Sequence, residues 1–141
     1  MQEVSVIIPN FNGMAYLDGV LAGLECQTVD DFEVILVDNG SSDGSCAFVA
    51  ARYPWVHLIE LPENFGFCKA VNEGIRASRS PYVLLLNNDI EVTDNFIEEM
   101  TDAIKRHPKA FSCAARMIQF HDRDRLDDAG NYYCALGWAY A

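Results

Sequence analysis

The apolar stretch 83–86 ends abruptly in the polar sequence Asn87-Asn88-Asp89. It has the length of a strand and lacks the alternation typical of a strand with one exposed face, so we expect a central parallel strand buried on both faces. In open α/β sheets, ligands bind beyond the carboxyl ends of such strands. Asp89 would supply a hard anionic oxygen there, which suits a divalent cation that bridges to substrate phosphates. From these residues alone a second interpretation stays open, a turn that caps a helix near Thr93.

The predicted strands 4–8 and 32–37 also end in polar loops that contain glycine. Because the carboxyl ends of parallel strands share one edge of a sheet, we expect Asn10, Asp38 and Asp89 to converge on one crevice. Asp38 could accept hydrogen bonds from a base or a ribose there. The alternative is that its loop is a flexible turn and nothing more.

A third polar stretch, residues 64–69, contains Asn64, Gly66 and Lys69 where a predicted helix begins. A turn glycine and a helix cap would explain these residues, and a phosphate or base held at the helix N-terminus is the alternative. The glycine pattern of dinucleotide-binding folds does not follow the first strand, and the P-loop lysine pattern is missing as well. The sequence therefore disfavours both of those nucleotide-binding classes.

These loops must be positioned by strands and helices that alternate along the chain. We expect strands at 4–8, 32–37, 56–61, 82–86 and 111–120, and helices at 16–24, 43–53, 69–78 and 94–107. Ser42 or Asp43 is expected to cap the second helix, and Thr93 or Asp94 the fourth. The third helix is expected to bury Ile75. This alternation is the signature of an α/β fold, a Rossmann-like, mostly parallel sheet with helices on both faces.

Composition excludes several classes of protein. The formal net charge of −11 and the lack of a basic run argue against nucleic acid as a partner. The 5 cysteines show no C-x-x-C spacing, which indicates free thiols in a reducing compartment. No signal peptide and no apolar run of about 18 residues is present. We expect a cytoplasmic protein, and for a longer chain a peripheral position at the inner face of the membrane is the further alternative.

The end of the chain, residues 131–141, is rich in Gly, Ala, Trp and Tyr and lacks a polar tail. We expect it to continue into a longer protein, and a genuine C-terminus that packs back on the sheet is the alternative. Exposed Trp138 and Tyr140 would promote self-association if their covering were absent.

The motifs VSVIIPNFNG, VDNGSSDGS, ENFGFCKAVNEGI and LLLNNDIEV, in this order and spacing, resemble family 2 nucleotide-sugar glycosyltransferases, and most of all the rhamnosyltransferase-type branch. The resemblance covers about residues 4–130 and implies a GT-A fold. It makes residues 1–141 the N-terminal, donor-binding portion of the catalytic domain, with the portion that carries the acceptor site and general base missing. It also implies a Mn²⁺ or Mg²⁺ cofactor. The implied reaction is inverting transfer from a UDP- or dTDP-sugar to a saccharide, lipid-linked or other hydroxyl acceptor.

The resemblance also implies roles for single residues. Asp38 would contact the nucleobase, and Asp89 would be the main metal ligand. Asn87 replaces the first carboxylate of the family's D-x-D motif, so it is the weaker candidate for a direct ligand. The residues implied in nucleotide binding are Pro9, Asn10, Phe11, Asn12, Asp38, Asn64, Gly66, Lys69 and Asn88.

An inverting transfer also needs a general base that takes the proton of the acceptor hydroxyl. In the family this carboxylate comes from a later acidic motif, so we expect it beyond Ala141. Asp127 and Asp128 are the alternative, although their surroundings are typical of a solvated loop. Two other functions stay open, a non-catalytic nucleotide-binding α/β module and a sugar-nucleotidyltransferase. The second is disfavoured because the loop PNFNG is short and uncharged.

Overall fold

The computed structural model describes residues 2–128, 132–133 and 139–140. The chain divides into two compact units, Met1–Thr101 and Asp102–Ala141. All the motifs that the sequence singles out for donor and metal binding lie in the first unit. No helix among the described residues is both long enough and apolar enough to span a membrane.

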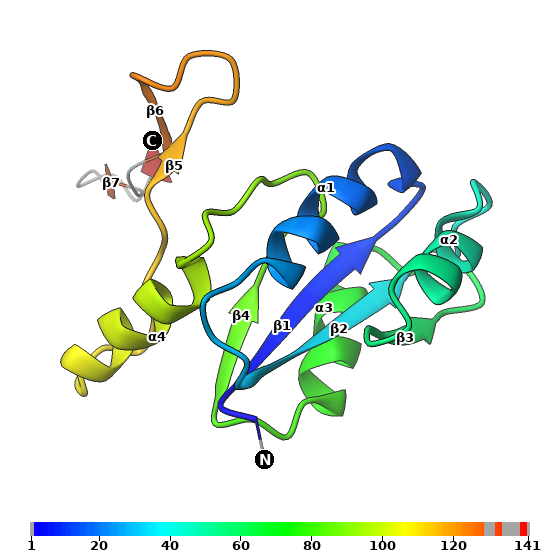
Figure 1. Cartoon of the computed structure of the whole chain (residues 1–141), viewed down its shortest axis with the longest axis horizontal. Helices are drawn as coiled ribbons and strands as arrows, with labels where there is room; N and C mark the ends of the chain where they lie inside the picture. The colour runs from blue at the N-terminus through cyan, green and yellow to red at the C-terminus, as the bar shows by residue number, and fades with distance from the viewer. Residues whose placement is uncertain (1, 129–131, 134–138, 141) are drawn as a thin grey trace. The chain divides into compact units, whose positions relative to one another are not determined.

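The first unit is built on a four-stranded sheet in the order β3-β2-β1-β4, in which every neighbouring pair is parallel (Figure 1). Its strands are β1 (Val4–Asn10), β2 (Phe32–Asp38), β3 (His57–Glu60) and β4 (Tyr82–Leu85). In the register of β1 and β2, Asn10 lies opposite Asp38. The expected parallel α/β architecture is confirmed, and the last residues of the two middle strands are neighbours.

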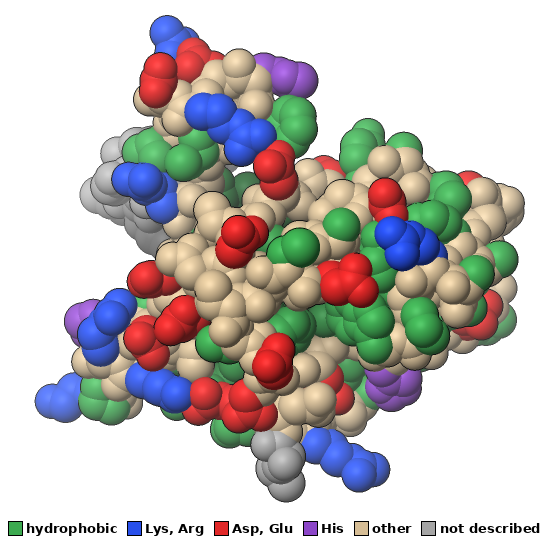
Figure 2. Space-filling model, viewed as in Figure 1, with side chains coloured by type: hydrophobic (Ala, Val, Ile, Leu, Met, Phe, Trp, Pro, Cys, Tyr) green, Lys and Arg blue, Asp and Glu red, His purple; other side chains and the backbone are tan. Residues whose placement is uncertain are grey.

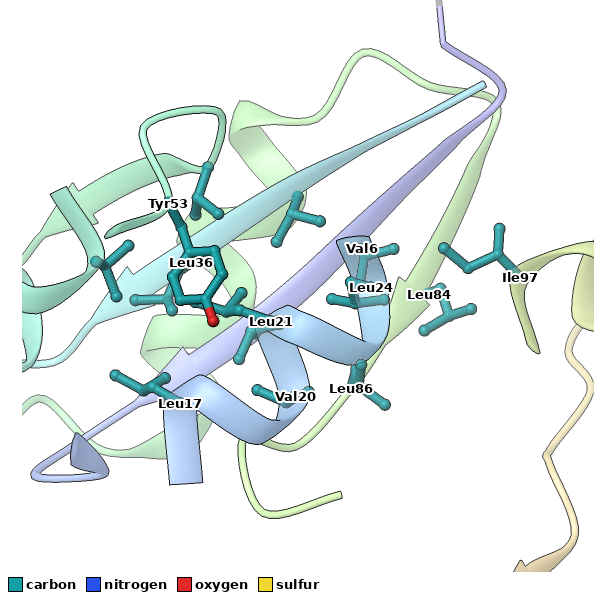
Figure 3. Close-up of a cluster of buried hydrophobic side chains, with 14 of the residues drawn as sticks. Val6, Leu17, Val20, Leu21, Leu24, Leu36, Tyr53, Leu84, Leu86 and Ile97 are labelled. Atoms are coloured by element: carbon teal, nitrogen blue, oxygen red, sulfur yellow. The ribbon is translucent and has the colours of Figure 1, made fainter. Parts of the chain in front are cut away.

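Four helices connect and follow these strands. They are α1 (Met14–Glu25), α2 (Ser45–Arg52), α3 (Phe67–Ala77) and α4 (Phe96–Arg106). One face of the sheet buries Val6 and Ile8 against the α1 residues Leu17 and Leu21, and Ile97 of α4 joins this cluster (Figure 3). The alternate residues of the strands face α3, so the sheet carries helices on both faces, as expected (Figure 1).

The prediction of a central strand at 82–86 was wrong in one respect, because β4 is an edge strand. Among the strands that the structure describes, it pairs with β1 alone, and α3 lies over β1 and β2 instead. Leu84 is buried on the α1 side, whereas Val83 and Leu85 on the other side are 41% and 54% exposed. A run of apolar residues cannot by itself tell a strand covered on both faces from an edge strand with one open face.

The third helix also differs from expectation at Ile75, which is 41% exposed. The face of α3 that meets the sheet contains Ala70 and Gly74. A Cβ on Gly74 would lie 2.4 Å from Cγ2 of Ile7, so the glycine lets α3 approach the sheet closely. Small residues, not Ile75, therefore form the contact.

The capping residues were only partly predicted. The residue before α2 is Gly44, not Ser42 or Asp43, but Asp43 Oδ1 still accepts a hydrogen bond from Ser45 N–H at 3.0 Å. α4 begins at Phe96, which is later than a cap at Thr93 or Asp94 would predict. Its Ile97 N–H donates to Gln27 Oε1 at 2.9 Å, so a side chain that follows α1 satisfies this helix start.

The predicted fifth strand at 111–120 is wrong except at its end. Only β5 (Met117–Ile118) forms, and it pairs antiparallel with β6 (Leu126–Asp128) outside the main sheet. The run of small residues after Phe111 has low strand propensity, and Phe111 itself is fully exposed. A second antiparallel pair joins β7 (Tyr132–Tyr133) and β8 (Ala139–Tyr140).

Two expectations concern residues at the end of the chain. Self-association was predicted from the side chains of Trp138, which lies outside the described residues, and Tyr140, of which only the backbone is described. Among the described cysteines, Cys26, Cys46 and Cys68 are free thiols. Acidic side chains are spread over much of the face in Figure 2, in keeping with the net charge of −11.

Candidate functional site

The centre of the site is a buried pair of polar side chains at the ends of β1 and β2. Asn10 Nδ2 donates to Asp38 Oδ1 at 2.8 Å, and the backbone N–H of Ser41 donates to Asp38 Oδ2 at 2.8 Å. Burial by itself would raise the pKa of Asp38, but hydrogen bonds from Ser41, Asn10 and Cys46 outweigh it and hold the pKa below its ordinary value. Asp38 is therefore an ionised carboxylate that is only 1% exposed.

The loop after β1 is tied to the loop after β2. Asn12 N–H donates to Ser41 Oγ at 2.8 Å, and Ser42 N–H donates to Asn12 Oδ1 at 2.9 Å. Asn12 adopts a φ of 51°, a conformation that Asn tolerates better than most residues. Asp43 Oδ2 accepts a further bond from Met14 N–H at 2.9 Å. These bonds join the two loops into one rim, in which Asn12 has a structural contact on both its backbone and its side chain.

A third loop, between β3 and α3, is tied to the end of β2 through Asn39. Asn39 Nδ2 donates to Asn64 Oδ1 at 2.9 Å, and Phe65 N–H donates to Asn39 Oδ1 at 3.0 Å. Gly40, at a φ of 77°, has no room for a Cβ, which would lie 2.6 Å from Cα of Glu63. Sequence reasoning missed Asn39. The sequence does place Asn39 directly after Asp38. Because consecutive side chains of an extended chain point to opposite faces, this position predicts that Asn39 faces away from Asp38, toward the other side of the sheet.

A hollow of about 230 Å³ opens on the α3 side of these strand ends. It combines the exposed rings of Phe11 and Phe67 with the amides of three asparagines. Its lining residues are Pro9, Asn10, Phe11, Asn39, Asn64, Gly66, Phe67 and Ala70. The hollow therefore gathers five of the residues that the sequence singled out for nucleotide binding, and it adds Asn39, Phe67 and Ala70.

The remaining candidates for nucleotide binding lie outside this lining. Asp38 and Asn12 belong to the rim described above, and Asn88 contacts Asn10 from the end of β4. Lys69 forms an ion pair with Glu73 on an exposed part of α3. A second hollow of similar volume lies by Phe32, at the other end of β2, and has none of these polar loops.

The loop after β4 reaches the same edge of the sheet through its middle residue. Asn88 Nδ2 donates to Asn10 Oδ1 at 2.7 Å. Asn87 and Asp89, on either side of it, are exposed. The structure thus brings Asn10, Asp38 and Asn88 into one hydrogen-bonded chain, with Asp89 next to it in the sequence. The side chain of Asp89 is free of the packing that buries Asp38.

The residues at this edge fit one kind of cation site. No cluster of three or more His, Cys, Asp or Glu side chains suited to a metal occurs in the described part of the chain. A closed, all-protein cage is therefore not what these residues offer. Mg²⁺ keeps several waters and is commonly bound by one or two carboxylates together with substrate phosphates. Asp89, exposed in the loop after β4, suits a cation that is shared with a diphosphate.

Comparison with known proteins gives a consistent picture. A model of the family described as glycosyl transferase family 2 matches residues 5–138. The N-acetylglucosaminyl-diphospho-decaprenol L-rhamnosyltransferase of Mycobacterium tuberculosis is 30% identical over 116 residues, which cover 74% of this chain and 38% of that protein. For three other curated relatives that it matches, the chain spans 34%, 42% and 50% of their lengths.

Solved structures agree with the sequence relatives. TarS 1–349 of S. aureus, in complex with UDP-GlcNAc, matches with a TM-score of 0.69 and 26% identity over 77% of this chain and 32% of that one. The mannosyltransferase PcManGT of Pyrobaculum calidifontis, in complex with GDP-Man and Mn²⁺, matches with a TM-score of 0.68 and 24% identity over 72% of this chain and 32% of that one. The second likeness shows the fold alone.

Proposed function

The chain belongs to glycosyl transferase family 2 and has the GT-A fold, and we propose that it forms the donor-binding part of a metal-dependent, inverting glycosyltransferase. The donor would be a sugar linked to a nucleoside diphosphate, UDP or dTDP. The observation that supports this most is the meeting of three polar strand ends, with an aromatic hollow beside them and an exposed carboxylate, Asp89, in the loop after β4.

The hollow beside α3 is suited to a nucleobase. Phe11 and Phe67 are 48% and 59% exposed, so their rings can stack on a planar ligand. Asn39 and Asn64 supply amide groups on the same lining. Asp38 would contact a base N–H as well, as the family resemblance implies, because the end of β2 places it next to Asn39 of this lining.

The diphosphate would lie toward the loop after β4. A bound Mn²⁺ or Mg²⁺ would supply Lewis acid chemistry and neutralise the leaving diphosphate. Asp89 would hold this cation, and Asn87 would be a weaker ligand because an amide oxygen carries no formal charge. The mannosyltransferase PcManGT, which shares this fold, forms a complex with GDP-Man and Mn²⁺, and this supports the proposed use of a metal.

The general base remains a prediction. Of the alternatives named from the sequence, Asp127 is exposed in the second unit, and Asp128 ends β6. Neither belongs to the hydrogen-bonded strand ends of the first unit. We propose, as the family resemblance implies, that an acidic motif of a longer protein takes the proton of the acceptor hydroxyl.

The acceptor is proposed by class only. The name of the rhamnosyltransferase relative contains N-acetylglucosaminyl-diphospho-decaprenol, which supports a lipid-linked saccharide as acceptor. A non-catalytic nucleotide-binding module is the competing function. It would bind a nucleotide through the hollow with no gain from a divalent cation.

Calorimetric titration tests the proposal. UDP, dTDP and GDP are titrated into the chain with Mn²⁺ and then with EDTA in its place. We expect UDP or dTDP to bind more tightly with Mn²⁺. Binding that is indifferent to the cation would favour the non-catalytic module, and tighter binding of GDP would contradict the proposed base.

A further inference from the structure

The Asn88–Asn10 hydrogen bond ties the β4 loop to the buried strand ends. The last ladder bond before the loop joins Leu86 N–H to Ile7 O at 3.0 Å. Beyond it, the side chain of Asn88 donates to Asn10 at 2.7 Å, while Asn87 and Asp89 stand exposed on either side. Asn88 is therefore the residue that fixes this loop on the strand ends.

The direction of this bond follows from the charge of Asp38. A carboxylate only accepts hydrogen bonds, so Asn10 must turn its NH₂ group toward Asp38 and its carbonyl oxygen toward Asn88. Asn88 must then present its own NH₂ group to Asn10. The carbonyl oxygen of Asn88 is the arm of the amide that is turned away from Asn10. One buried charge thus sets the orientation of two amides in succession.

Gly13 leaves the space in which the two amides meet. A Cβ on Gly13 would lie 2.1 Å from Asn88 Nδ2 and 2.3 Å from Asn10 Oδ1, and real contacts essentially never fall below 3.0 Å. Its φ of −101° is open to any residue, so the backbone does not demand glycine here. The space that the Asn10 and Asn88 amides occupy is what requires a glycine at this position. A Cβ on Gly19, inside α1, would meet nothing within 4 Å.

We propose that Asn10 and Gly13 are positioning residues for the cation. Together they hold the Asn88 amide with its carbonyl oxygen turned away from Asn10, where it would accept hydrogen bonds from the waters of a cation that the next residue, Asp89, would hold on the donor diphosphate. The inference rests on the proposed function. Its chemistry is that of a hard cation, which keeps several waters and takes neutral oxygen acceptors around them. Groups that orient the ligands of a metal commonly change its affinity about 10–100-fold when they are lost.

The test compares Gly13→Ala, at the residue before α1, with Gly19→Ala, the same change inside α1 in open space. UDP is titrated into each variant with Mn²⁺ and with EDTA. We expect Gly13→Ala to lower the gain in affinity that Mn²⁺ brings by about 10-fold and to leave the affinity in EDTA unchanged. Gly19→Ala should match the parent in both. Equal loss with and without Mn²⁺, or no loss, would overturn the inference.

A double-mutant cycle asks whether Gly13 acts through Asn88. In an Asn88→Ala background the amide pair and the clash with Asn88 are gone, and only the close approach of a Gly13 Cβ to Asn10 Oδ1 remains. A displaced Asn10 then has no Asn88 amide to misplace, so adding Gly13→Ala should cost nothing more in the Mn²⁺-dependent gain. A further loss as large as in the parent background would show that Gly13 acts by another route, and the positioning role would be wrong.

Side-chain NH₂ signals in the NMR spectrum of the ligand-free chain separate this inference from the proposed function. The Asn88 signal should move in Gly13→Ala and stay in place in Gly19→Ala. If it does not move, the amide pair is not in contact and the inference alone falls, even where UDP binding depends on Mn²⁺. A parent chain whose affinity for all three nucleotides ignores Mn²⁺ would overturn the metal-dependent function and the inference together.

Discussion

The ends of β1 and β2 and the end of β4 meet at one edge of the sheet, yet they are built in opposite ways. Asn10, Asp38 and Asn39 are 2%, 1% and 3% exposed and are held by bonds to two neighbouring loops. Asn87 and Asp89 are exposed, and a hydrogen bond from the Asn88 side chain joins their loop to Asn10. A buried, paired carboxylate is pre-organised, whereas an exposed one can exchange its water for a cation at little cost.

This difference suggests that the two sides of the donor site bind different parts of the nucleotide. The β1 and β2 side would select the base, because its groups are already in place before a ligand arrives. The β4 side would bind the diphosphate through a cation that brings most of its own ligands. Mutations on the two sides should therefore differ in whether their effect on nucleotide affinity depends on metal.

The largest effect is expected for Asp89→Ala. The affinity for UDP in Mn²⁺ should fall by at least about 10–100-fold, and the affinity in EDTA should not change. The free energy of unfolding should stay within about 0.5 kcal/mol of the parent, because the side chain is exposed. Asp30→Ala, an exposed aspartate near the start of β2, is the matched control. Unchanged affinity in Mn²⁺ would remove Asp89 from the metal site.

Asp38→Ala should act on both binding and stability. Loss of the carboxylate leaves the Asn10 amide and the Ser41 N–H without their partner, which costs about 1–3 kcal/mol in the free energy of unfolding. Nucleotide affinity should weaken by a similar free energy with Mn²⁺ and with EDTA. Inorganic diphosphate in Mn²⁺ serves as the control ligand. If its affinity falls as much as that of UDP, the loss does not lie in the base.

The titration of Asp38 sharpens the same point. Its pKa is lowered in the folded chain, so it contributes stability that is complete above its ordinary value of 3.8 and is lost as the pH falls through the lower folded pKa. Acid unfolding of the parent should therefore show a loss of stability below this value that Asp38→Asn lacks. Parallel curves for the two proteins would mean that the hydrogen bonds of Asp38 do not favour its charged form.

Phe67→Ala tests the stacking surface of the hollow. The ring is 59% exposed, so its removal should leave stability nearly unchanged. Stacking of a base on an aromatic side chain is worth about 1–3 kcal/mol, and we expect a loss near the lower end because Phe11 remains. Ile75→Ala, an exposed apolar residue on the same helix, is the control. Equal affinity in the two variants would place the base elsewhere.

The smallest effect is expected for Asn87→Ala. A neutral amide is a weaker ligand for a hard cation than a carboxylate, so the Mn²⁺-dependent gain should fall by less than in Asp89→Ala. Calorimetry of the two variants side by side measures this order. A loss as large as that of Asp89→Ala would make Asn87 a direct ligand.

The sequence predicts the strand ends well because they are set by local rules. A run of apolar residues that stops at Asn10, Asp38 or Asn87 fixes where a parallel strand ends, and topology then brings the ends together. The sequence does not predict which strand lies at the edge of the sheet. The apolar residues of β4 indicate a buried strand whether or not a neighbouring element covers Leu85. That property depends on the rest of the fold.

Two features of the site needed three-dimensional information. Asn39 looks like part of a turn, and its contact with Asn64 depends on a loop 25 residues later. From the sequence, Gly13 is explained by its place at the start of a helix. The reason that a Cβ is excluded there is the contact between Asn10 and Asn88, which are 78 residues apart in the sequence. Both depend on long-range contacts that no local pattern records.

The most direct test of the account is to locate nucleotide and cation on the two sides of the site by NMR. UDP with Mg²⁺ should shift the backbone signals of Phe11, Asn39 and Phe67, and replacing Mg²⁺ with paramagnetic Mn²⁺ should then broaden the signals of Asn88 and Asp89 first. Broadening centred elsewhere in the chain, such as around Glu25 and Asp30, would contradict the proposed donor site. So would nucleotide shifts that spare the hollow beside α3.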